Sequence, residues 1–440
     1  MSESLNSSSE TDVKKTYKSW RNRIFFTVWI TYMIYYIGRT NISIAKPFIM
    51  DEYGISEAVM GLVGTTFFLA YAFGQFVNGF LGDKVGARRF ITIGLIISSV
   101  INIFMGGAFE LIWVAFLLWG LNGYFQSMGW APSVKTIANW HPAEDRGKWS
   151  SRLATSYLLG GVVSWVIAIF ITETLSLNWR FSFIIPGIIM LFMGIHFFIR
   201  CRNAPEECGL PTIEEEFEGK MEMGDCRDDE FVGFKHTAKT VFFTKTVLFA
   251  SFGLFCLNMV RYGLTDWLPY LINQEITVGT AKDIFKIWKA IFYPIGGTLG
   301  VIVAAWVSDK FVGKKRMPVI CALFIALSFT LFLYTLLPPL DLVFGIPVLI
   351  LIGFLNFGPH ALLVATIPME FGTRKAASAA TGFIDGWGYI GAAITTFFSG
   401  ALIGAVGSWA AFLLWIIVAL IGGLVLLLDW KSLPERKEYL

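Results

Sequence analysis

Two arginines lie deep inside long apolar segments, and they are the strongest candidates in the chain for a functional site. Arg39 lies about 15–20 residues into the apolar stretch 24–49, and Arg261 lies at a similar depth in 243–272. A charged side chain in a membrane interior costs at least about 2.5–3.5 kcal/mol, so it normally faces water or a partner. A guanidinium binds phosphate or carboxylate through two parallel hydrogen bonds. The pair therefore predicts a site for a small anionic molecule.

A structural ion pair is the alternative interpretation of these arginines. Arg261 could pair with Asp266, and Arg39 could pair with Asp385. Lys46, near the far end of the first apolar stretch, is expected to extend its ammonium to the membrane surface.

The composition indicates which elements must position the arginines. The chain has 440 residues, of which 55% are hydrophobic and 15% are charged, whereas soluble domains are about 25% charged. A spanning helix needs roughly 20 apolar residues, so the hydrophobic residues suffice for about twelve spans. This composition excludes a soluble enzyme, a nucleic-acid-binding protein and a disordered chain. The short alternating segments of a β-barrel are missing from the sequence.

The predicted fold is an all-α integral membrane protein with twelve transmembrane helices in two pseudo-symmetric six-helix bundles. The spans are placed at 24–49, 59–81, 90–109, 111–138, 150–173, 181–199, 243–272, 285–308, 318–337, 343–366, 376–402 and 408–429. The predicted regions are a tail (1–23), a first bundle (24–199), a polar linker (200–242), a second bundle (243–429) and a tail (430–440). Gly160 with Gly161, and Gly296 with Gly297, are expected where helices pack closely.

Basic residues give the orientation. Twenty lysines and arginines flank the spans on one side, against at most four on the other: Arg180, Lys282, Lys286 and Lys289. The positive-inside rule then places both termini and the linker in the cytoplasm, as expected for a multi-pass plasma-membrane protein. No cleavable signal peptide is expected, and the five cysteines are expected to be reduced thiols.

The two halves of the chain repeat each other. Gly82-Asp83-Lys84-Val85-Gly86-Ala87-Arg88-Arg89 follows the second span, and Ser308-Asp309-Lys310-Phe311-Val312-Gly313-Lys314-Lys315-Arg316 follows the eighth. Asp83 and Asp309 are 226 residues apart, and Arg39 and Arg261 are 222 apart. Parallel repeats of this kind build one large class of transporters around a site at mid-membrane.

The loop after the second span resembles the signature of the major facilitator superfamily. Four longer stretches are similar to the organophosphate:phosphate antiporters, which include bacterial glycerol-3-phosphate and hexose-phosphate transporters: Tyr35–Arg39, Phe125–Pro132, Asn203–Pro211 and Arg261–Trp267. The resemblance covers nearly the whole chain and is tightest from Trp20 to about Pro211.

The resemblance implies a substrate site. Arg39 and Arg261 match the paired phosphate-binding arginines of that family, and Tyr32, Tyr36 and Tyr389 match tyrosines that line the site. The glycerol-3-phosphate carrier adds a lysine in span two and a histidine in span five. This chain has Gln75 and Tyr157 there, and it carries two further candidates for coupling transport to protons, Asp385 and His360.

The repeated cytoplasmic loops are candidates for gating. Asp83, Arg88, Asp309 and Arg316 are expected to anchor these loops to neighbouring helices in the state that is open to the outside.

The predicted function is secondary transport of an organic phosphate by alternating access, in exchange for inorganic phosphate. A second hypothesis keeps the carrier but changes the substrate to a carboxylate or sulfonate, with proton symport through Asp385 or His360. A third is a transporter-like sensor of sugar phosphates. An enzyme is not expected, because the chain has no P-loop and no credible nucleophile, base and metal set. The expected partners are the anionic substrate, inorganic phosphate and the lipid bilayer, with no cofactor, metal, nucleotide or nucleic acid, and the chain is expected to be a monomer.

Overall fold

Apolar segments of this length fold as helices because in lipid every backbone polar group must be satisfied within its own segment. The computed structural model describes residues 2–213, 244–276, 287–311, 317–336, 345–366 and 374–430. Every regular element within these ranges is helical, which confirms the all-α expectation. The cysteines in these ranges, Cys201, Cys208, Cys256 and Cys321, are free thiols.

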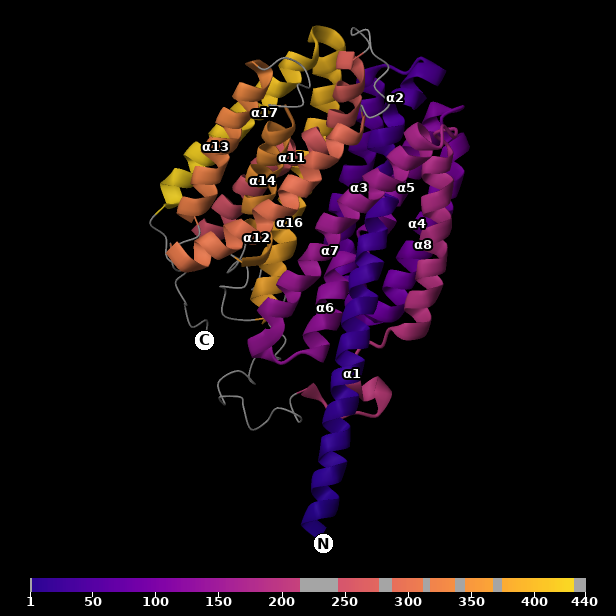
Figure 1. The fold of residues 1–440 in the computed structure, drawn as a ribbon, viewed down its shortest axis with the longest axis vertical. Helices are drawn as coiled ribbons and strands as arrows, with labels where there is room; N and C mark the ends of the chain where they lie inside the picture. Colours follow the sequence, from indigo (N-terminus) through magenta and orange to yellow (C-terminus); the bar gives the residue numbers. More distant parts are fainter. Residues whose placement is uncertain are drawn as a thin grey trace.

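The helices of the two halves form two groups (Figure 1). The first half contains α1 (Ser2–Ile37), α2 (Asn41–Tyr53), α3 (Glu57–Val85), α4 (Ala87–Ala108), α5 (Ile112–Gln126), α6 (Trp130–Trp140), α7 (Ala143–Ile169), a π-helical turn (Phe170–Thr174), α8 (Phe181–Arg200) and a 3-10 turn (Pro205–Cys208). The second half contains α11 (Lys245–Ile276), a 3-10 turn (Ile287–Ile291), α12 (Phe292–Phe311), α13 (Met317–Leu336), α14 (Gly345–Ala361), a π-helical turn (Leu362–Thr366), α16 (Arg374–Val406), α17 (Ser408–Leu426) and a 3-10 turn (Leu427–Asp429). The N-terminal end of α1 projects from the bundles, and we call the half of the molecule away from it the distal half.

The elements follow the twelve predicted spans in order. Within the described part of the chain, nine helices are long and apolar enough to cross a membrane. The other three spans correspond to α1 with α2, to α5 with α6, and to α12, whose apolar part (Trp288–Ala304) is shorter. Two of these three spans differ from the predicted continuous helices because each is interrupted, at residues 38–40 and 127–129.

The interruption in the first span is stabilised by buried amides. Asn102 Nδ2 and Asn122 Nδ2 donate hydrogen bonds to the Gly38 carbonyl oxygen at 3.1 and 2.9 Å. A carbonyl that leaves the helical ladder would otherwise be unsatisfied in a buried site. The chain therefore leaves the helix at the residue that precedes Arg39.

The two halves pack most closely where α3 meets α16. A Cβ at Gly64 would collide with the Thr396 side chain, and Thr65 Oγ1 donates a hydrogen bond to the Ala393 carbonyl oxygen at 2.9 Å. Small residues let membrane helices approach this closely.

The expected glycine contacts are correct for three of the four glycines. A Cβ at Gly160 would lie 2.7 Å from the Met33 carbonyl oxygen, and Gly296 and Gly297 face Ile350 and Phe357 of α14. Gly161 is the correction, because a Cβ there would meet nothing within 4 Å. Of these two adjacent glycines, Gly160 is the one that faces the neighbouring helix, α1.

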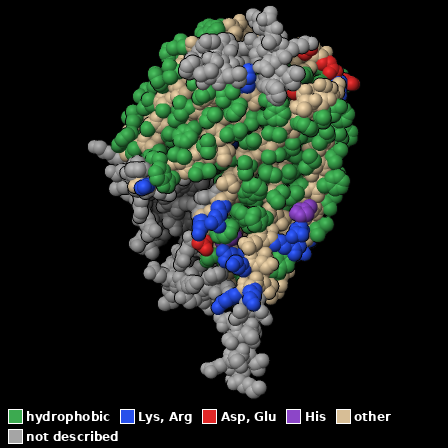
Figure 2. Space-filling view, viewed as in Figure 1, with side chains coloured by type: hydrophobic (Ala, Val, Ile, Leu, Met, Phe, Trp, Pro, Cys, Tyr) green, Lys and Arg blue, Asp and Glu red, His purple; other side chains and the backbone are tan. Residues whose placement is uncertain are grey.

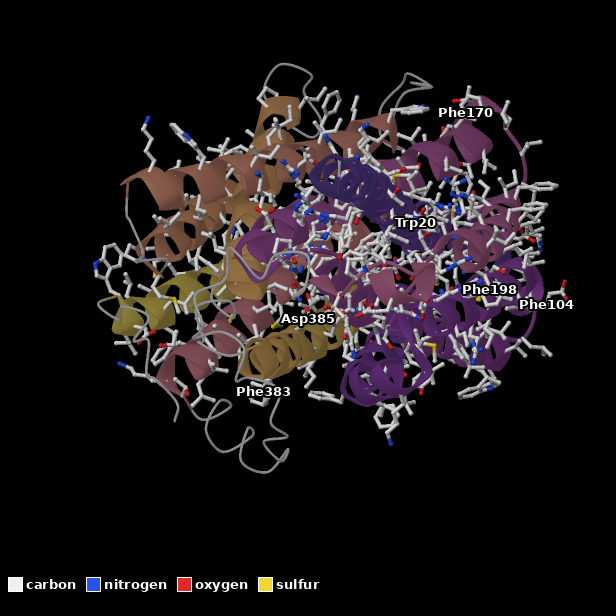
Figure 3. The ribbon with its side chains drawn as sticks, turned by 90° about the horizontal axis from the view of Figure 1, so that it is seen from below. Trp20, Phe104, Phe170, Phe198, Phe383 and Asp385 are labelled. Atoms are coloured by element: carbon white, nitrogen blue, oxygen red, sulfur yellow. The ribbon has the colours of Figure 1, made fainter. Side chains whose placement is uncertain are left out.

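The surface has the pattern of a membrane protein. Figure 2 shows apolar side chains over the middle of the molecule and basic side chains gathered toward the end from which α1 projects. Phe104 and Phe170 are 66% and 46% exposed and lie at the periphery in Figure 3, whereas Asp385 lies inside. An exposed apolar belt of this kind requires lipid around it.

Charged residues at the distal edge of the first bundle hold α2 to α8. Arg180 Nη2 lies 2.7 Å from Glu52 Oε1, and Trp179 Nε1 donates to Glu52 Oε2 at the same distance. Hydrogen bonds from Arg180 and Trp179 hold the pKa of the exposed Glu52 carboxyl below its ordinary value.

The packing of α12 on α14 leads to the first prediction. Gly296→Val should lower the free energy of unfolding by about 1–3 kcal/mol, because the added side chain would overlap the backbone of α14. Gly161→Val is the matched control and should have a much smaller effect, since the space beside it is open. Thermal unfolding of the purified protein in detergent measures both, and equal losses in the two variants would contradict the packing argument.

Candidate functional site

Arg39 lies in the interruption between α1 and α2, and its guanidinium is almost completely buried, at 3% exposed. Its Nη2 donates hydrogen bonds to Tyr71 Oη and Gln126 Oε1, both at 3.3 Å. The guanidinium carbon also lies 4.5 Å from the centre of the Tyr36 ring and 4.6 Å from that of Tyr71. No described residue accepts a hydrogen bond from its Nε or Nη1. Arg39 therefore keeps two buried donors for a ligand.

A chain of polar side chains fixes the direction of the Arg39 guanidinium. Gln126 Nε2 donates to Ser98 Oγ at 2.9 Å, and Ser98 Oγ donates to Asn122 Oδ1 at 2.5 Å. Asn122 in turn holds the Gly38 carbonyl oxygen. The same network thus stabilises the helix break and orients the arginine, so these side chains position Arg39.

Arg261 occupies the equivalent place in the second half, on α11, and is also 3% exposed. Its guanidinium carbon lies 4.6 Å from the ring centre of Phe357, 5.0 Å from Tyr262 and 5.7 Å from Tyr157. These aromatic faces attract the cation. Its Nε has no hydrogen-bond partner within the described ranges.

The two arginines belong to one closed ring of contacts. We define the arginine–tyrosine ring as, in order, Arg39, Tyr71, Tyr389, Tyr262, Arg261, Tyr157 and Tyr36. Two of its links cross between the halves of the chain. The ring centres of Tyr71 and Tyr389 are 4.2 Å apart, and Tyr157 of the first half lies beside Arg261 of the second. The ring therefore depends on both halves.

The structure brings most of the predicted site residues to this ring. Tyr36, Tyr157 and Tyr389 are members of it. Tyr32 lies one helical turn from Tyr36, with their ring centres 6.0 Å apart. Gln75 follows Tyr71 by one turn of α3, and its Nε2 is buried without a partner in the described part of the chain.

Tyr71, Tyr262 and Gln126 were not predicted from the sequence. Tyr71 could have been found, since residues four apart share one face of a helix and Gln75 was already a candidate. Tyr262 and Gln126 gave weaker signals, because adjacency to Arg261 or a single amide in an apolar span does not fix where a side chain points.

Asp385 lies on α16, one turn before Tyr389, and is 7% exposed. It interacts electrostatically with both Arg261 and Arg39. Among the ion pairs of the described residues, none joins Asp385 to either arginine. Asp385 thus adds a carboxyl group to the site while leaving the arginine donors unoccupied, and the alternative of an Arg39–Asp385 pair is wrong for this structure.

Lys46 differs most from its expected place. Its Nζ lies 2.7 Å from Asp266 Oδ2 and 3.8 Å from the centre of the Trp267 ring, and only 1% of its side chain is exposed. The two charges attract strongly at this distance. Lys46 does not extend to the membrane surface, and Asp266 neutralises Lys46 rather than Arg261. The ion pair joins α2 to α11 and so crosses between the halves.

Other groups close the distal half around this ion pair. Tyr270 Oη, one turn beyond Asp266, donates a hydrogen bond to Glu57 Oε1 of α3 at 2.6 Å. A small cavity remains between Arg39 and Asp266, with Ser43 and Thr265 among its lining residues. The distal contacts therefore reach from the end of the bundles down to the arginine–tyrosine ring.

The candidate gating residues are only partly described. Arg88 donates from its backbone N to Asn203 Oδ1 at 2.8 Å and from Nε to the Phe198 carbonyl oxygen at 2.6 Å. These bonds tie the start of α4 to the end of α8 and to the segment that follows it. Asp83 and Asp309 lie near the ends of α3 and α12, but their side chains, like the whole of Arg316, lie outside the described residues.

Comparison with known proteins gives the site a context. The family model of the Major Facilitator Superfamily matches residues 28–396. The chain is 31% identical to the "Probable hexose phosphate transport protein" of Chlamydia trachomatis, with 96% of this chain and 94% of the relative covered. It is 28% identical to the glycerol-3-phosphate transporter of Bacillus subtilis, with 96% and 95% covered. It is also 28% identical to the membrane sensor protein UhpC of Escherichia coli, with 87% and 86% covered.

A solved structure shares the fold. It is a bacterial homologue of the human lysosomal transporter Spinster, in an inward-facing and occupied conformation. The TM-score is 0.71 at 14% sequence identity, with 93% of this chain and 96% of the other covered. The likeness supports the arrangement of twelve helices in two bundles.

The Lys46–Asp266 pair leads to the second prediction. Lys46→Met or Asp266→Leu should lower the free energy of unfolding by about 3–5 kcal/mol, because each leaves an unpaired charge in a buried site. The double variant should recover most of that loss. Thermal unfolding in detergent measures the three variants.

The exposed Glu52–Arg180 pair serves as the control for this prediction. Arg180→Met should cost less than about 1 kcal/mol, since its partner remains in water. Additive losses in the Lys46/Asp266 double variant would show that the two charges do not depend on each other.

Proposed function

This chain belongs to the Major Facilitator Superfamily and, within it, to the organophosphate:phosphate antiporter family, and on that premise we propose that it carries an organic phosphate across the membrane by alternating access. The named relatives include hexose phosphate and glycerol-3-phosphate transporters. The substrate is accordingly an ester of phosphate with a sugar or a glycerol-like alcohol.

The observation that carries this proposal is a set of buried donors without acceptors. Arg39 offers Nε and Nη1, and Arg261 offers Nε, and no described residue accepts from any of them. Buried charged donors without partners are costly. A phosphate group has three strong acceptor oxygens and is matched by guanidinium forks from two sides. Arg39 and Arg261 would therefore hold the phosphate between the two bundles.

Exchange for inorganic phosphate follows from the same chemistry. Inorganic phosphate carries the same acceptor oxygens as the ester, so the two ligands would compete for one pair of arginines. An empty site would leave two neighbouring positive charges in a low-dielectric environment, which opposes the return of an unloaded carrier. Obligatory exchange is the expected consequence.

Alternating access would rock one bundle against the other around this site. In the present conformation Lys46–Asp266 and Tyr270–Glu57 join the bundles in the distal half. We assign the distal half to the outside and both termini to the cytoplasm, because the basic residues gather at the other end. The ion pair would then have to separate for the site to open outward. We further propose that the carrier works as a monomer in the plasma membrane.

The similarity to a membrane sensor protein supports a second candidate function. A sensor could keep the arginine–tyrosine ring, bind the phosphate ester and transmit a signal without moving the ligand. Binding without exchange is the result that would favour the sensor.

Counterflow in proteoliposomes tests the proposal. Vesicles loaded with inorganic phosphate should take up labelled glycerol 3-phosphate or glucose 6-phosphate, and vesicles without internal phosphate should not. Uptake of a carboxylate or sulfonate driven by a proton gradient alone would instead support the second hypothesis from the sequence.

The third prediction concerns the two arginines. Arg39→Lys and Arg261→Lys should each reduce exchange by more than about tenfold at similar expression, because lysine keeps the charge but cannot form the planar two-bond contact. Arg152→Lys, at an exposed position of α7, is the matched control and should be unaffected. Normal exchange by both site variants would exclude a guanidinium clamp.

The fourth prediction concerns Asp385. The formal charge of Arg39, Arg261 and Asp385 is +1 when the carboxyl is ionised and +2 when it is protonated, so a dianionic phosphate prefers the protonated form. Binding should then take up a proton, and affinity should weaken as the pH rises. Asp385→Asn should bind with little dependence on pH.

Two corrections accompany this measurement. The phosphate itself titrates near pH 6, so affinity must be expressed for the dianion. His360 also lies beside Arg261, and the His360→Gln variant separates its contribution. A wild-type affinity that is flat between about pH 5.5 and 8 after both corrections would reduce Asp385 to an electrostatic neighbour of the arginines.

A further inference from the structure

A hydrogen bond between Tyr157 and His360 crosses from one bundle to the other beside the arginine–tyrosine ring. His360 Nδ1 lies 3.3 Å from Tyr157 Oη, and the two ring centres are 5.7 Å apart in an edge-to-face arrangement. Tyr157 belongs to α7 of the first half and His360 to α14 of the second. Both residues are buried, each 7% exposed. The mechanism proposed above gives this pair no role.

Within its own bundle, α14 packs closely on α12 through glycines, and those close contacts do not involve His360. The helix is held to α12 by close backbone approach, with Gly296 against Ile350 and Gly353 against Tyr293. Gly358, two residues before His360, faces Ala304 and Gly300 of α12. An imidazole between the bundles therefore adds a desolvation cost that the helix packing does not require.

The position of His360 relates it to the substrate. Tyr157 is in contact with both halves of the site, since its ring stacks on that of Tyr36 at 6.2 Å and lies 5.7 Å from the Arg261 guanidinium. His360 also interacts electrostatically with Arg261. The imidazole is thus placed next to the group that would hold the phosphate, on the edge of the same ring.

The chemistry of the pair differs from that of the arginines. A neutral imidazole has one donor and one acceptor nitrogen, and the tautomer is set by the partner of the other nitrogen. Tyr157 engages Nδ1, which leaves Nε2 as the second polar atom of the imidazole. Charged guanidinium groups suit phosphate, whereas a neutral nitrogen suits a neutral hydroxyl group. The site therefore offers separate groups for the two parts of a phosphate ester.

We propose that His360, positioned by Tyr157, is a specificity-determining residue that hydrogen-bonds a hydroxyl group on the organic part of the substrate. This inference rests on the proposed function, because it assigns the phosphate of the same substrate to Arg39 and Arg261. It narrows the substrate class to phosphate esters that carry a free hydroxyl group close to the phosphate. Tyr157 and His360 come from opposite bundles, so this contact exists only while the bundles are close together at the site.

Three ligands that share a phosphate group should differ in how they contact His360. Inorganic phosphate has no organic part, and propyl phosphate has a chain of the same carbon number as glycerol 3-phosphate but no hydroxyl groups. A hydrogen bond to a substrate hydroxyl favours that substrate over the analogue that lacks the hydroxyl. The wild-type protein should bind glycerol 3-phosphate, or glucose 6-phosphate if that ester binds better, more tightly than propyl phosphate.

The experiment measures the dissociation constants of these ligands for the full-length protein in detergent. His360→Ala should weaken binding of the hydroxylated ester by about three- to tenfold, the usual value of one neutral hydrogen bond. Binding of inorganic phosphate and of propyl phosphate should stay the same. Tyr157→Phe keeps the aromatic ring but removes the hydroxyl group. It should weaken binding of the hydroxylated ester by less than His360→Ala does. His196→Ala, at an exposed position near the end of α8, is the matched control and should leave the dissociation constants of all three ligands unchanged.

Three results would overturn the inference. Equally weakened binding of all three ligands in His360→Ala would mean that His360 contacts the phosphate group or only stabilises the fold. No weakening for the ester would leave the imidazole without a substrate contact. Failure of the wild type to bind any phosphate compound would refute the proposed function itself, which the wild-type measurement decides before any variant is compared. If His360→Ala unfolds, His360→Gln retains polar groups of similar reach and should keep part of the preference for the hydroxylated ester.

Discussion

Two guanidinium groups buried at the centre of a membrane protein are the constraint on which the rest of this structure depends. Neither can lie in lipid, because a charge there costs several kcal/mol. The protein surrounds each with aromatic faces and satisfies only part of its hydrogen-bonding capacity, as the free Nε and Nη1 of Arg39 show. The helix break beside Arg39 and the network of Ser98, Asn122 and Gln126 exist to hold one of these groups in place. The donors that remain without a partner in the described part of the chain are the groups that the proposed phosphate would engage.

The interface between the bundles follows from the same constraint. The proposed site takes one arginine from each half, so its access would change only if the halves separate. In the distal half they are joined by a buried ion pair and by the Tyr270–Glu57 hydrogen bond. At the site they are joined by weaker contacts, the Tyr71–Tyr389 ring contact and the Tyr157–His360 hydrogen bond. A ligand that contacts both halves at the ring would add to the contacts between the bundles at the site. Because those contacts are weaker than the distal ones, a small binding free energy there would shift the equilibrium between the conformations.

The sequence predicted the fold well because membrane insertion leaves few alternatives. The apolar segments gave the spans, and the repeat gave the relation of Arg39 to Arg261. One expectation and one alternative failed for the same reason, which is that the partner of a charged group is not decided locally. Lys46 was expected at the membrane surface, and an Arg261–Asp266 ion pair was the alternative to a ligand site, but the fold brings Lys46 to Asp266 instead. The predicted continuous span over 24–49 was also wrong, because the amides that stabilise its interruption, Asn102 and Asn122, come from other helices.

The sequence by itself determined the class of protein, the number of spans and the identity of the two arginines, since hydropathy, charge and an internal repeat are properties of the chain. Tertiary structure alone decided which groups remain free to bind a ligand. In the described part of the chain, Arg39 Nε and Nη1 and Arg261 Nε have no partner, since Asp266 is neutralised by Lys46 and Asp385 makes no ion pair with either arginine. It also decided that His360 meets Tyr157 across the bundles. Residues more than 200 positions apart meet only when two packed bundles bring them together, and no local pattern in the sequence encodes that distance.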